Sequence, residues 1–494
     1  MKHWQFLLVL CLVLIFVVAS CGRNAGEPGY PGQPDDIPAA VDDNGNDDQD
    51  QPAARQGVPM PEAGSTIRAA FIGGWWEDPA LFDFVFDNFR ERYPQFNLER
   101  VGHISTSVQL LTHIQAGDQP DFWLGTDTQW AQYSTSTFER LMMPLNDFLE
   151  RDLYVNFDTM DRQIMDMFRF LDGNYYGLPH ATAHWALFWN RDMFARAGLP
   201  NRAPETWNEM LDFAQRLIVL NTDGLATQVG FSVDGTEGPF TFQMLPTMGL
   251  SQTDRYGLWA DLTNPAVEAT HRFTSEFYQL IDGIRIPGFL YRLHLGTAGM
   301  AIGNLSQLST IAESGIDFGI APIPHPNEGG LDHHVLPSLI WQFGGIPYGA
   351  RNPEGGWLFM KYVVTEVAFN LARNDMLRAP GTSLPAFAAH IPTRERIETL
   401  FFSQADERTA NIMRERNELM ENLPFFMEPG SPLSYEMSNI SHAWGIRRHQ
   451  EGMSLSDFLR GIETEYNSVL QTWMRGLEAQ GWQFPRGQTP IPPS

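Results

Sequence analysis

The chain has 494 residues, which is more than one hydrophobic core usually organises, so its length predicts two lobes or domains. With 43% apolar and 12% aromatic residues it can build large cores, which excludes a wholly disordered chain. Its 33 Lys and Arg against 59 Asp and Glu give a net charge of −26, and this acidic balance argues against a nucleic-acid partner.

The first 21 residues have the pattern of a secretory signal. A short basic start at Lys2 precedes an apolar run over 6–18, which is too short to span a membrane comfortably. Small residues then lead to Cys21, and the ending VASC resembles a bacterial lipobox, in which the cysteine is acylated and becomes the first mature residue. We therefore expect residues 1–20 to be a lipoprotein signal peptide. Cys21 would carry the lipid anchor, with palmitate among its acyl chains. An ordinary signal peptide with a chance cysteine is the alternative.

The folded body contains no cysteine, because Cys11 and Cys21 both lie in this leader. Disulfides, thiol catalysis and cysteine-based zinc sites are therefore excluded from it. Residues 21–66 are rich in Gly, Pro, Gln, Asn and Asp and almost lack large apolar side chains. The aspartates repel one another, and too few apolar residues are present to form a core. We therefore expect a disordered acidic tether. The spacing and central glycine of a calcium loop are missing, which favours a passive spacer.

Beyond the tether, short apolar strands alternate with amphipathic helices, which indicates an α/β fold. The sequence predicts strands over 67–72, 97–104 and 121–125. After the first strand, Asp78 and Pro79 have the pattern of a helix cap followed by proline at the first helical position.

Later helices are predicted from the same kinds of signal. A capping box at 206–209 and Asn-Pro pairs at 264–265 and 352–353 mark three helix starts. The longest apolar stripe at helical spacing runs over 455–473, near the C-terminus.

No enzyme signature is present in the sequence. The chain has no Gly-rich phosphate loop ending in Lys-Ser/Thr, no G-x-S-x-G elbow and no G-x-G-x-x-G after a strand. His180 and His184 stand four apart, a spacing that presents two metal ligands on a helix, but the glutamate of a metalloprotease is missing. His325, His333 and His334 lie in a predicted loop. Hydrogen-bonding or surface roles are favoured for both groups, so we expect no metal and no cofactor.

Several tryptophans follow or end predicted strands. In open α/β sheets, ligands bind beyond the carboxyl ends of the strands, where a ring can stack on a sugar while polar neighbours bind its hydroxyls. Core packing is the alternative for each ring, and it is the stronger interpretation for Trp189, Trp207 and Trp357, which lie in periodic stripes. The candidate sugar-stacking residues are Trp75, Trp76, Trp130, Trp185 and Trp341.

A series of motifs in a fixed order resembles a known family. The motifs are QLLTHIQAGDQPDFWLGTD, ERLMMPLNDFLERD, YYGLPHATAHWALFWNRDMFARAGL, PETWNEMLDFAQRL, TAGMAIGN, FGIAPIPHP, GGIPYGARNPEGGWLFMKYVVTE and a terminal helix with Tyr466 and Asn467. Together they resemble the extracellular solute-binding proteins of sugar ABC transporters, family 1, which are related to maltose-binding protein. The resemblance runs from about residue 67 to about residue 480.

This resemblance implies two α/β lobes of the periplasmic-binding-protein type, with a ligand cleft between them that closes by hinge motion. The first lobe would hold 66–180 and 343–400, and the second lobe would hold 184–340 and 401–494. With the tryptophans above, the resemblance gives the candidate ligand contacts Trp75, Trp76, Glu77, Asp127, Gln129, Trp130, His180, His184, Trp185, Glu237, Phe240, Asn304, Trp341 and Trp444.

We therefore expect a substrate-binding lipoprotein of an ABC importer, and not an enzyme. It would capture a mono- or oligosaccharide outside the cytoplasmic membrane and deliver it to the permease subunits, as a monomer held on the cell membrane by its lipid and facing the periplasm or the extracellular space. One alternative is the same fold binding a peptide, polyamine or sugar phosphate, although few basic residues near the loops argue against anions. The others are a secreted glycoside hydrolase with a carboxylate pair, and a surface adhesin or structural lipoprotein.

Overall fold

The computed structural model covers most of the chain beyond residue 56. It describes residues 57–72, 79–126, 141–166, 168–169, 172–233, 241, 243–254, 257–282, 293–327, 331, 333–378, 384–427, 431 and 433–486. The chain divides into two units, Met1–Ala54 and Arg55–Ser494, and everything described below belongs to the second. The predicted signal peptide and residues 21–56 of the predicted tether lie outside the described residues. The remaining tether residues, 57–66, contact the folded body: the backbone N–H of Gly64 donates to the Gln95 carbonyl at 2.8 Å, and Thr66 begins β1.

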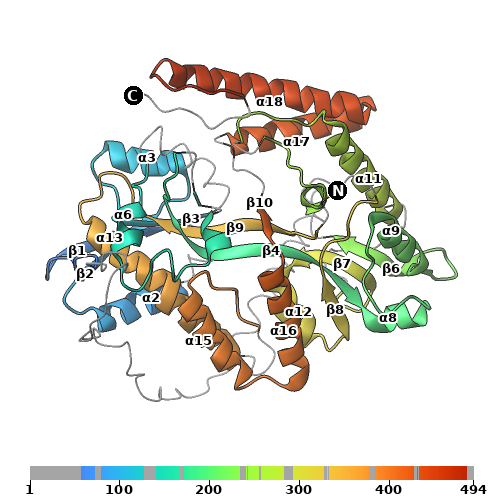
Figure 1. The fold of residues 1–494 in the computed structure, drawn as a ribbon, viewed down its shortest axis with the longest axis horizontal. Helices are drawn as coiled ribbons and strands as arrows, with labels where there is room; N and C mark the ends of the chain where they lie inside the picture. The colour runs from blue at the N-terminus through green and yellow to red at the C-terminus, as the bar shows by residue number, and fades with distance from the viewer. Residues whose placement is uncertain are drawn as a thin grey trace, which may run out of the picture. The chain divides into compact units, whose positions relative to one another are not determined.

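A mixed sheet of ten strands forms the centre of this unit (Figure 1). The strand order is β2-β1-β3-β9-β4-β7-β6-β5, with β10 paired to β9 and β8 paired to β4. The strands are β1 (Thr66–Phe71), β2 (Asn97–His103), β3 (Phe122–Thr126), β4 (Leu178–Asn190), β5 (Val219–Leu220), β6 (Ala226–Val233), β7 (Ala298–Asn304), β8 (Phe318–Ala321), β9 (Leu336–Gly345) and β10 (Phe425–Met427).

The pairing directions confirm the predicted α/β class. Strand β1 runs parallel to both β2 and β3, and β6 runs parallel to β7, so each pair needs a crossover connection. Strand β9 is antiparallel to β3 and to β4. The three predicted strands over 67–72, 97–104 and 121–125 correspond to β1, β2 and β3, with ends that differ by one residue.

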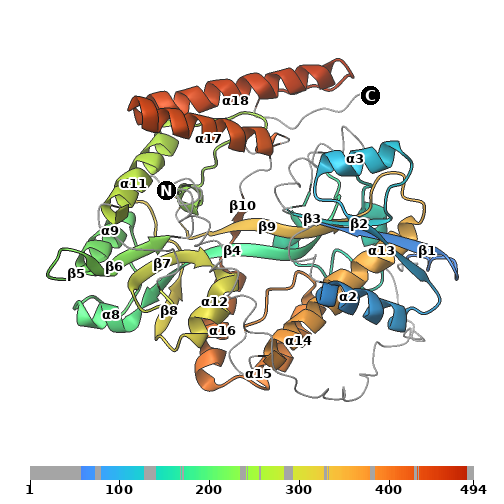
Figure 2. The ribbon, with the colours of Figure 1, turned by 180° about the vertical axis from the view of Figure 1, so that it is seen from behind.

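Helices lie above and below this sheet. Both views place α3, α17 and α18 on one side, and α15 and α16 on the other (Figures 1 and 2). The helices are α2 (Pro79–Arg92), α3 (Ser107–Gln115), α6 (Asn146–Arg151), α7 (Arg162–Asp166), α8 (Arg191–Arg196), α9 (Trp207–Arg216), α11 (Pro265–Asp282), α12 (Leu308–Glu313), α13 (Pro353–Tyr362), α14 (Ala368–Arg378), α15 (Ile391–Phe402), α16 (Glu407–Asn422), α17 (Ser434–Glu451) and α18 (Leu455–Glu478). Short turns are the 3₁₀ segments η2 (Leu245–Met248) and η3 (Leu305–Gln307) and the π-helical segment η4 (Val363–Val367).

The predicted helix starts are confirmed at Pro79, Trp207, Pro265 and Pro353, although Asp78 lies outside the described residues. The capping box at 206–209 forms on one side only. The Thr206 hydroxyl accepts from the backbone N–H of Glu209, whereas the Glu209 carboxylate accepts from the backbone N–H of Glu205 at 2.7 Å. Within the described residues, no helix is long and apolar enough to cross a membrane.

Separate apolar cores pack on different parts of the sheet. One core combines β1 and β3 with α2 and α13, and a second combines the end of β4 with β6, β7, α8 and α9. A further core joins α12, α14, α15 and α16, and another joins α11, α17 and α18. Trp189, Trp207 and Trp357 are 5%, 5% and 1% exposed, which confirms their predicted place in cores.

Asp152, at the end of α6, is a buried carboxylate that joins this helix to α13. It is 2% exposed and accepts hydrogen bonds from the backbone N–H of Val155 at 2.8 Å and from the Trp357 indole at 2.7 Å. The Lys361 ammonium lies 2.7 Å from the same carboxylate. Burial alone would raise the pKa of Asp152, but the charge of Lys361 and these hydrogen bonds outweigh it and lower the pKa.

We predict that Asp152→Asn lowers the free energy of unfolding at pH 7 by roughly 2–4 kcal/mol, because Lys361 and the donors lose a charged partner. The control Asp147→Asn removes a surface pair with Arg151 and should cost under about 1 kcal/mol. Urea denaturation of both variants measures the difference, and equal losses would contradict the prediction.

The same interaction gives a pH dependence of known sign. The pKa of Asp152 is lower in the folded state than in the unfolded state, so its stabilisation is complete above the unfolded value of about 3.9 and is lost as the pH falls below it. The stability gap between the wild type and Asp152→Asn should therefore shrink between pH 7 and pH 3.

Candidate functional site

Most predicted ligand contacts lie outside the described residues, in segments that directly follow described strands in the chain. Strands β1 and β3 are parallel and end at Phe71 and Thr126, so both strands have their carboxyl ends at the same edge of the sheet. Strand β6 ends at Val233, beside the parallel β7. The contacts in these loops are Trp75, Trp76, Glu77, Asp127, Gln129, Trp130, Glu237 and Phe240.

Five of the other six candidates lie on three neighbouring strands. Trp185 on β4 lies opposite Asn304 on β7 in the antiparallel register. His180 and His184 also belong to β4, and Trp341 lies on its other neighbour, β9, although the Trp341 side chain is outside the described part of the chain. Residues separated by more than a hundred positions therefore meet where β9, β4 and β7 run side by side.

His184 is buried at the pairing of β4 with β9. Its Nδ1 lies 2.8 Å from the Ser338 hydroxyl and its Nε2 lies 2.9 Å from the Thr182 hydroxyl. The ring is 2% exposed, and its centroid lies 4.5 Å from that of Phe425 on β10. Burial, with a smaller effect of nearby Arg416, lowers the pKa of His184 to about 3, so the ring is neutral at physiological pH.

His184 therefore has the hydrogen-bonding role that the sequence favoured over metal ligation. The segment that holds His180 and His184 is a strand, so the helical spacing of two metal ligands does not arise here. Burial lowers the pKa of His180 to about 4. Among the residues that the structure describes, no three His, Cys, Asp or Glu are arranged to hold a metal ion.

The partners of His184 were not found by sequence reasoning. Thr182 carried a usable signal, because residues two apart on a strand point to the same face. Ser338 carried none, since it is 154 positions away and only the fold brings it to the ring.

Asn304 and Trp185 are both half-buried at the carboxyl end of β7. The Asn304 side chain accepts a hydrogen bond from the backbone N–H of Ser306 at 2.9 Å and caps the short turn η3. The Trp185 ring packs on the core that contains β6, β7 and α9. An apolar ring beside an amide at a strand end is an arrangement that suits a sugar.

Comparison with known proteins assigns the family. The sequence profile described as bacterial extracellular solute-binding protein matches residues 73–368, which is more than half of the chain. The chain belongs to this family of solute-binding proteins. The resemblance seen in the sequence is thereby confirmed.

Relatives of this solute-binding protein differ in the ligands that they are named for. The maltotriose-binding protein of Pyrococcus abyssi is 22% identical over 270 residues, covering 51% of this chain and 52% of the relative. The sn-glycerol-3-phosphate-binding periplasmic protein of Agrobacterium fabrum is 26% identical over 216 residues, covering 41% of this chain and 48% of the relative. The chain thus spans about half the length of these two relatives.

A solved structure of CpMnBP1 with mannotriose bound shares the fold. It matches with a TM-score of 0.61 at 18% identity, over 81% of this chain and 99% of that chain. This likeness confirms the predicted two-lobe α/β fold of a periplasmic solute-binding protein.

Trp444, the last predicted contact of this solute-binding protein, lies on α17 and packs against α18. Its indole N–H donates to Glu465 at 2.8 Å, and the Arg447 guanidinium lies 4.2 Å from the ring centroid. A Cβ placed on Gly461 would come within 2.2 Å of the ring. A sugar on the ring face that Arg447 covers would have to displace this side chain, and a ligand contact at Trp444 stays a prediction.

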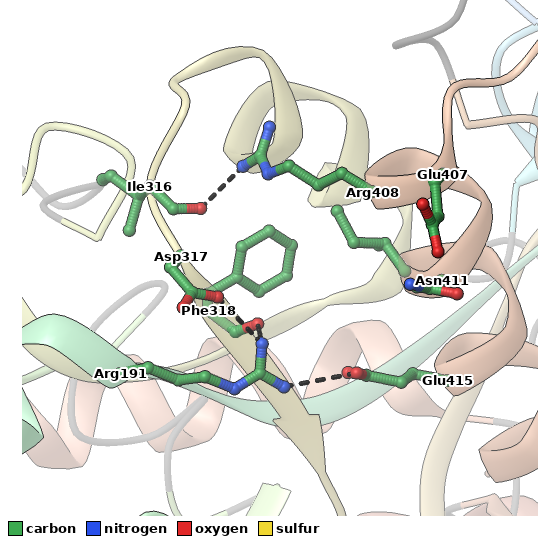
Figure 3. Close-up of a pocket in the computed structure, with 9 residues that line it drawn as sticks. Arg191, Ile316, Asp317, Phe318, Glu407, Arg408, Asn411 and Glu415 are labelled. Atoms are coloured by element: carbon green, nitrogen blue, oxygen red, sulfur yellow. Dashed lines mark hydrogen bonds and ion pairs between the residues drawn. The ribbon is translucent and has the colours of Figure 1, made fainter.

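A polar cavity of about 370 Å³ lies at the other end of β4 (Figure 3). Arg191, which lines the cavity, follows the last residue of β4, about 17 Å along the strand from Trp185. None of the predicted ligand contacts lines the cavity. The Arg191 guanidinium is bound by Asp317 at 2.9 Å and by Glu415 at 3.2 Å, so it ties α8 to β8 and α16. We therefore assign these groups a structural role.

We predict that Gly461→Ala loosens the contact between α17 and α18, because the added methyl group overlaps the Trp444 ring. The free energy of unfolding should fall by roughly 1–3 kcal/mol. The matched control is Gly445→Ala on α17, which has open space around the added Cβ and should be stabilised by up to about 1 kcal/mol. Thermal unfolding of the two variants measures both changes, and shifts of equal sign would disprove the packing argument.

Proposed function

We propose that this solute-binding protein is a lipid-anchored receptor that captures a mono- or oligosaccharide outside the cytoplasmic membrane and delivers it to an ABC permease. It acts as a monomer and performs no chemistry. The observation that carries the proposal is the pairing of Trp185 on β4 with Asn304 on β7, and most of the other predicted contacts follow β1, β3 and β6 directly in the chain. The maltotriose and mannotriose named for its relatives support a carbohydrate ligand.

The charge of the predicted contact loops supports a neutral ligand over a phosphorylated one. Loops 73–78, 127–140 and 234–240 contain six Asp and Glu but only one basic residue, Arg140. A phosphate ligand requires positive charge or several free N–H donors, whereas carboxylates accept hydrogen bonds from sugar hydroxyls. The glycerol-phosphate ligand of one relative is therefore the weaker candidate here.

The proposed mechanism is a population shift between open and closed arrangements of two lobes, 66–180 with 343–400 and 184–340 with 401–494. A ligand that contacts both lobes only in the closed state favours closure by its extra affinity for that state. The permease would then recognise the closed form. A secreted glycoside hydrolase, in contrast, would turn over chromogenic glycosides.

The binding proposal predicts the effect of three substitutions. Calorimetry against a panel of mono- and oligosaccharides should first identify a ligand, and absence of binding across the panel would reject the carbohydrate proposal. For that ligand, Asp127→Ala should weaken binding roughly tenfold to a hundredfold, because hydrogen bonds to a charged acceptor are lost. Trp75→Ala or Trp76→Ala should cause a comparable loss. Asp223→Ala, in an exposed turn, is the control and should keep wild-type affinity.

The lipid anchor is tested separately from ligand binding. We predict that Cys21→Ala abolishes incorporation of a palmitate label and releases the protein into the soluble fraction. Cys11→Ala is a matched control, because Cys11 would leave with the signal peptide, and it should be labelled normally. Unchanged labelling and membrane association of Cys21→Ala would reject the lipobox interpretation.

A further inference from the structure

The connection from α14 to α15 ends in a short segment, Leu384–Ile391, that we call the strap. Its first end is tied to α12, because the Ser309 hydroxyl accepts from the backbone N–H of Leu384 at 2.7 Å and donates to the Leu384 carbonyl at 3.2 Å. The buried Arg416 guanidinium of α16 donates to the Pro385 carbonyl. Both α12 and α16 lie in the proposed second lobe.

The other end of the strap is tied to the proposed first lobe. The backbone N–H of Asp161 donates to the Ala389 carbonyl at 2.7 Å, and the N–H of Ile391 donates to the Thr159 carbonyl at 2.8 Å. Just beyond the strap, Arg394 on α15 forms an ion pair with Asp161 at 2.9 Å, and both side chains are 17% exposed. The strap belongs to the proposed first lobe by its place in the chain, but its first end is bound to the second lobe, and its eight residues can span at most about 27 Å between the two sets of bonds.

Phe387 sits at the middle of the strap and contacts groups from both sides. Its ring packs partly buried on the core of β1, β3 and α13 and also on the core of α12, α14 and α16. The Arg394 guanidinium lies 4.1 Å from its centroid, and the His184 ring lies 6.3 Å away at an interplanar angle of 79°. The strap thus crosses beside His184, on the β4 strand that passes from one core to the other.

The strap lies on the face of the sheet opposite the predicted ligand contact Trp185. The His184 side chain points toward Phe387, and the next residue on an extended strand points to the other face. Figures 1 and 2 agree that α15 and α16, which flank or follow the strap, lie on one side of β4 and β9, whereas α3 and α17 lie on the other.

We propose that the strap is a built-in stop that limits how far the lobes of this receptor close, an inference that rests on the proposed hinge motion. When two lobes rotate about β4 and β9 so that the side of α3 and α17 closes, their opposite sides move apart. The strap, tied to both lobes on that opposite side, resists the separation together with the apolar core that α14 and α15 form with α12 and α16. It permits opening and sets the end point of closure.

The test measures the distance across the side of α3 and α17 without any ligand. Val108 on α3 and Ile446 on α17 are 71% and 46% exposed, so spin labels on Val108→Cys and Ile446→Cys disturb no core. The full-length chain with Cys11→Ser and Cys21→Ser contains no other cysteine. Double electron–electron resonance then gives the distribution of label distances.

Two changes weaken the restraint that the strap imposes: one lengthens the strap, and the other removes its hydrogen bonds to Ser309. Inserting two glycines after the exposed Ala386 lengthens it by up to about 7 Å. Ser309→Ala removes one tie and should raise the ratio of closed to open populations roughly threefold to tenfold, the effect of one or two neutral hydrogen bonds. The matched controls are the same insertion after Asp223 in an exposed turn, and Ser314→Ala, whose hydroxyl donates to the Ile311 carbonyl of α12 and accepts from the backbone N–H of Ile316, neither of which belongs to the strap.

The proposal requires a new component at shorter label distance in the lengthened strap and in Ser309→Ala, with neither control showing it and with Ser309→Thr restoring the wild-type distribution. Wild-type distributions in both strap variants, or the same change in the controls, would overturn it. If the insertion prevents folding, as judged by circular dichroism, Ser309→Ala and its threonine rescue decide the question. The distance measurement uses no ligand. If the protein fails to bind sugars, the proposed function is rejected, but the label distances still test the role of the strap.

Discussion

The antiparallel pairing of β4 with β9 is the constraint on which the rest of the structure depends. The first half of β4 pairs with β9, which continues to β3, while its second half pairs with β7 and β8. Strand β4 thereby contributes to two cores. A shift in its register with β9 would also shift its register with β7 and β8. His184, Ser338 and Arg416 at this crossing are 2%, 0% and 4% exposed, so their polar atoms depend on protein partners.

The polar groups at the crossing meet this need in two different ways. His184 loses its charge, because burial lowers its pKa to about 3, and a neutral ring can be satisfied by one hydroxyl on each side. Arg416 keeps its charge, since burial lowers its pKa only to about 10. It is held by the Pro385 carbonyl and by Asn417, with Glu398 at 3.9 Å. A buried cation with these acceptors fixes α16 against the strap.

Local sequence signals predicted the elements well and the contacts between them poorly. Proline at the first helical position and apolar alternation depend only on neighbours in the chain, and they located α2, α13, β1 and β3 to within a residue or so. Periodic stripes likewise separated core tryptophans such as Trp357 from the others. The surroundings of Trp444 were beyond this reasoning, because Gly461 and Glu465 meet its ring only when α17 folds back on α18. The residues that bind the strap come from segments around 160, 309 and 416. These segments are far apart in the chain, so no periodic pattern in the sequence relates them.

This division between local and long-range signals has a functional counterpart in the proposed receptor. Ligand chemistry is assigned to loops after the strands, where side chains can change without disturbing a core. The balance of open and closed states is assigned to the contacts between distant segments that hold the strap, Ser309 with Leu384 and Arg416 with Pro385. For a two-state receptor, the apparent dissociation constant is the intrinsic one divided by the fraction of protein in the competent state. A tenfold change in that fraction therefore changes affinity tenfold for every ligand alike, whereas a change in a contact loop alters the preference among ligands. Affinity and specificity can then be adjusted at separate places in the fold.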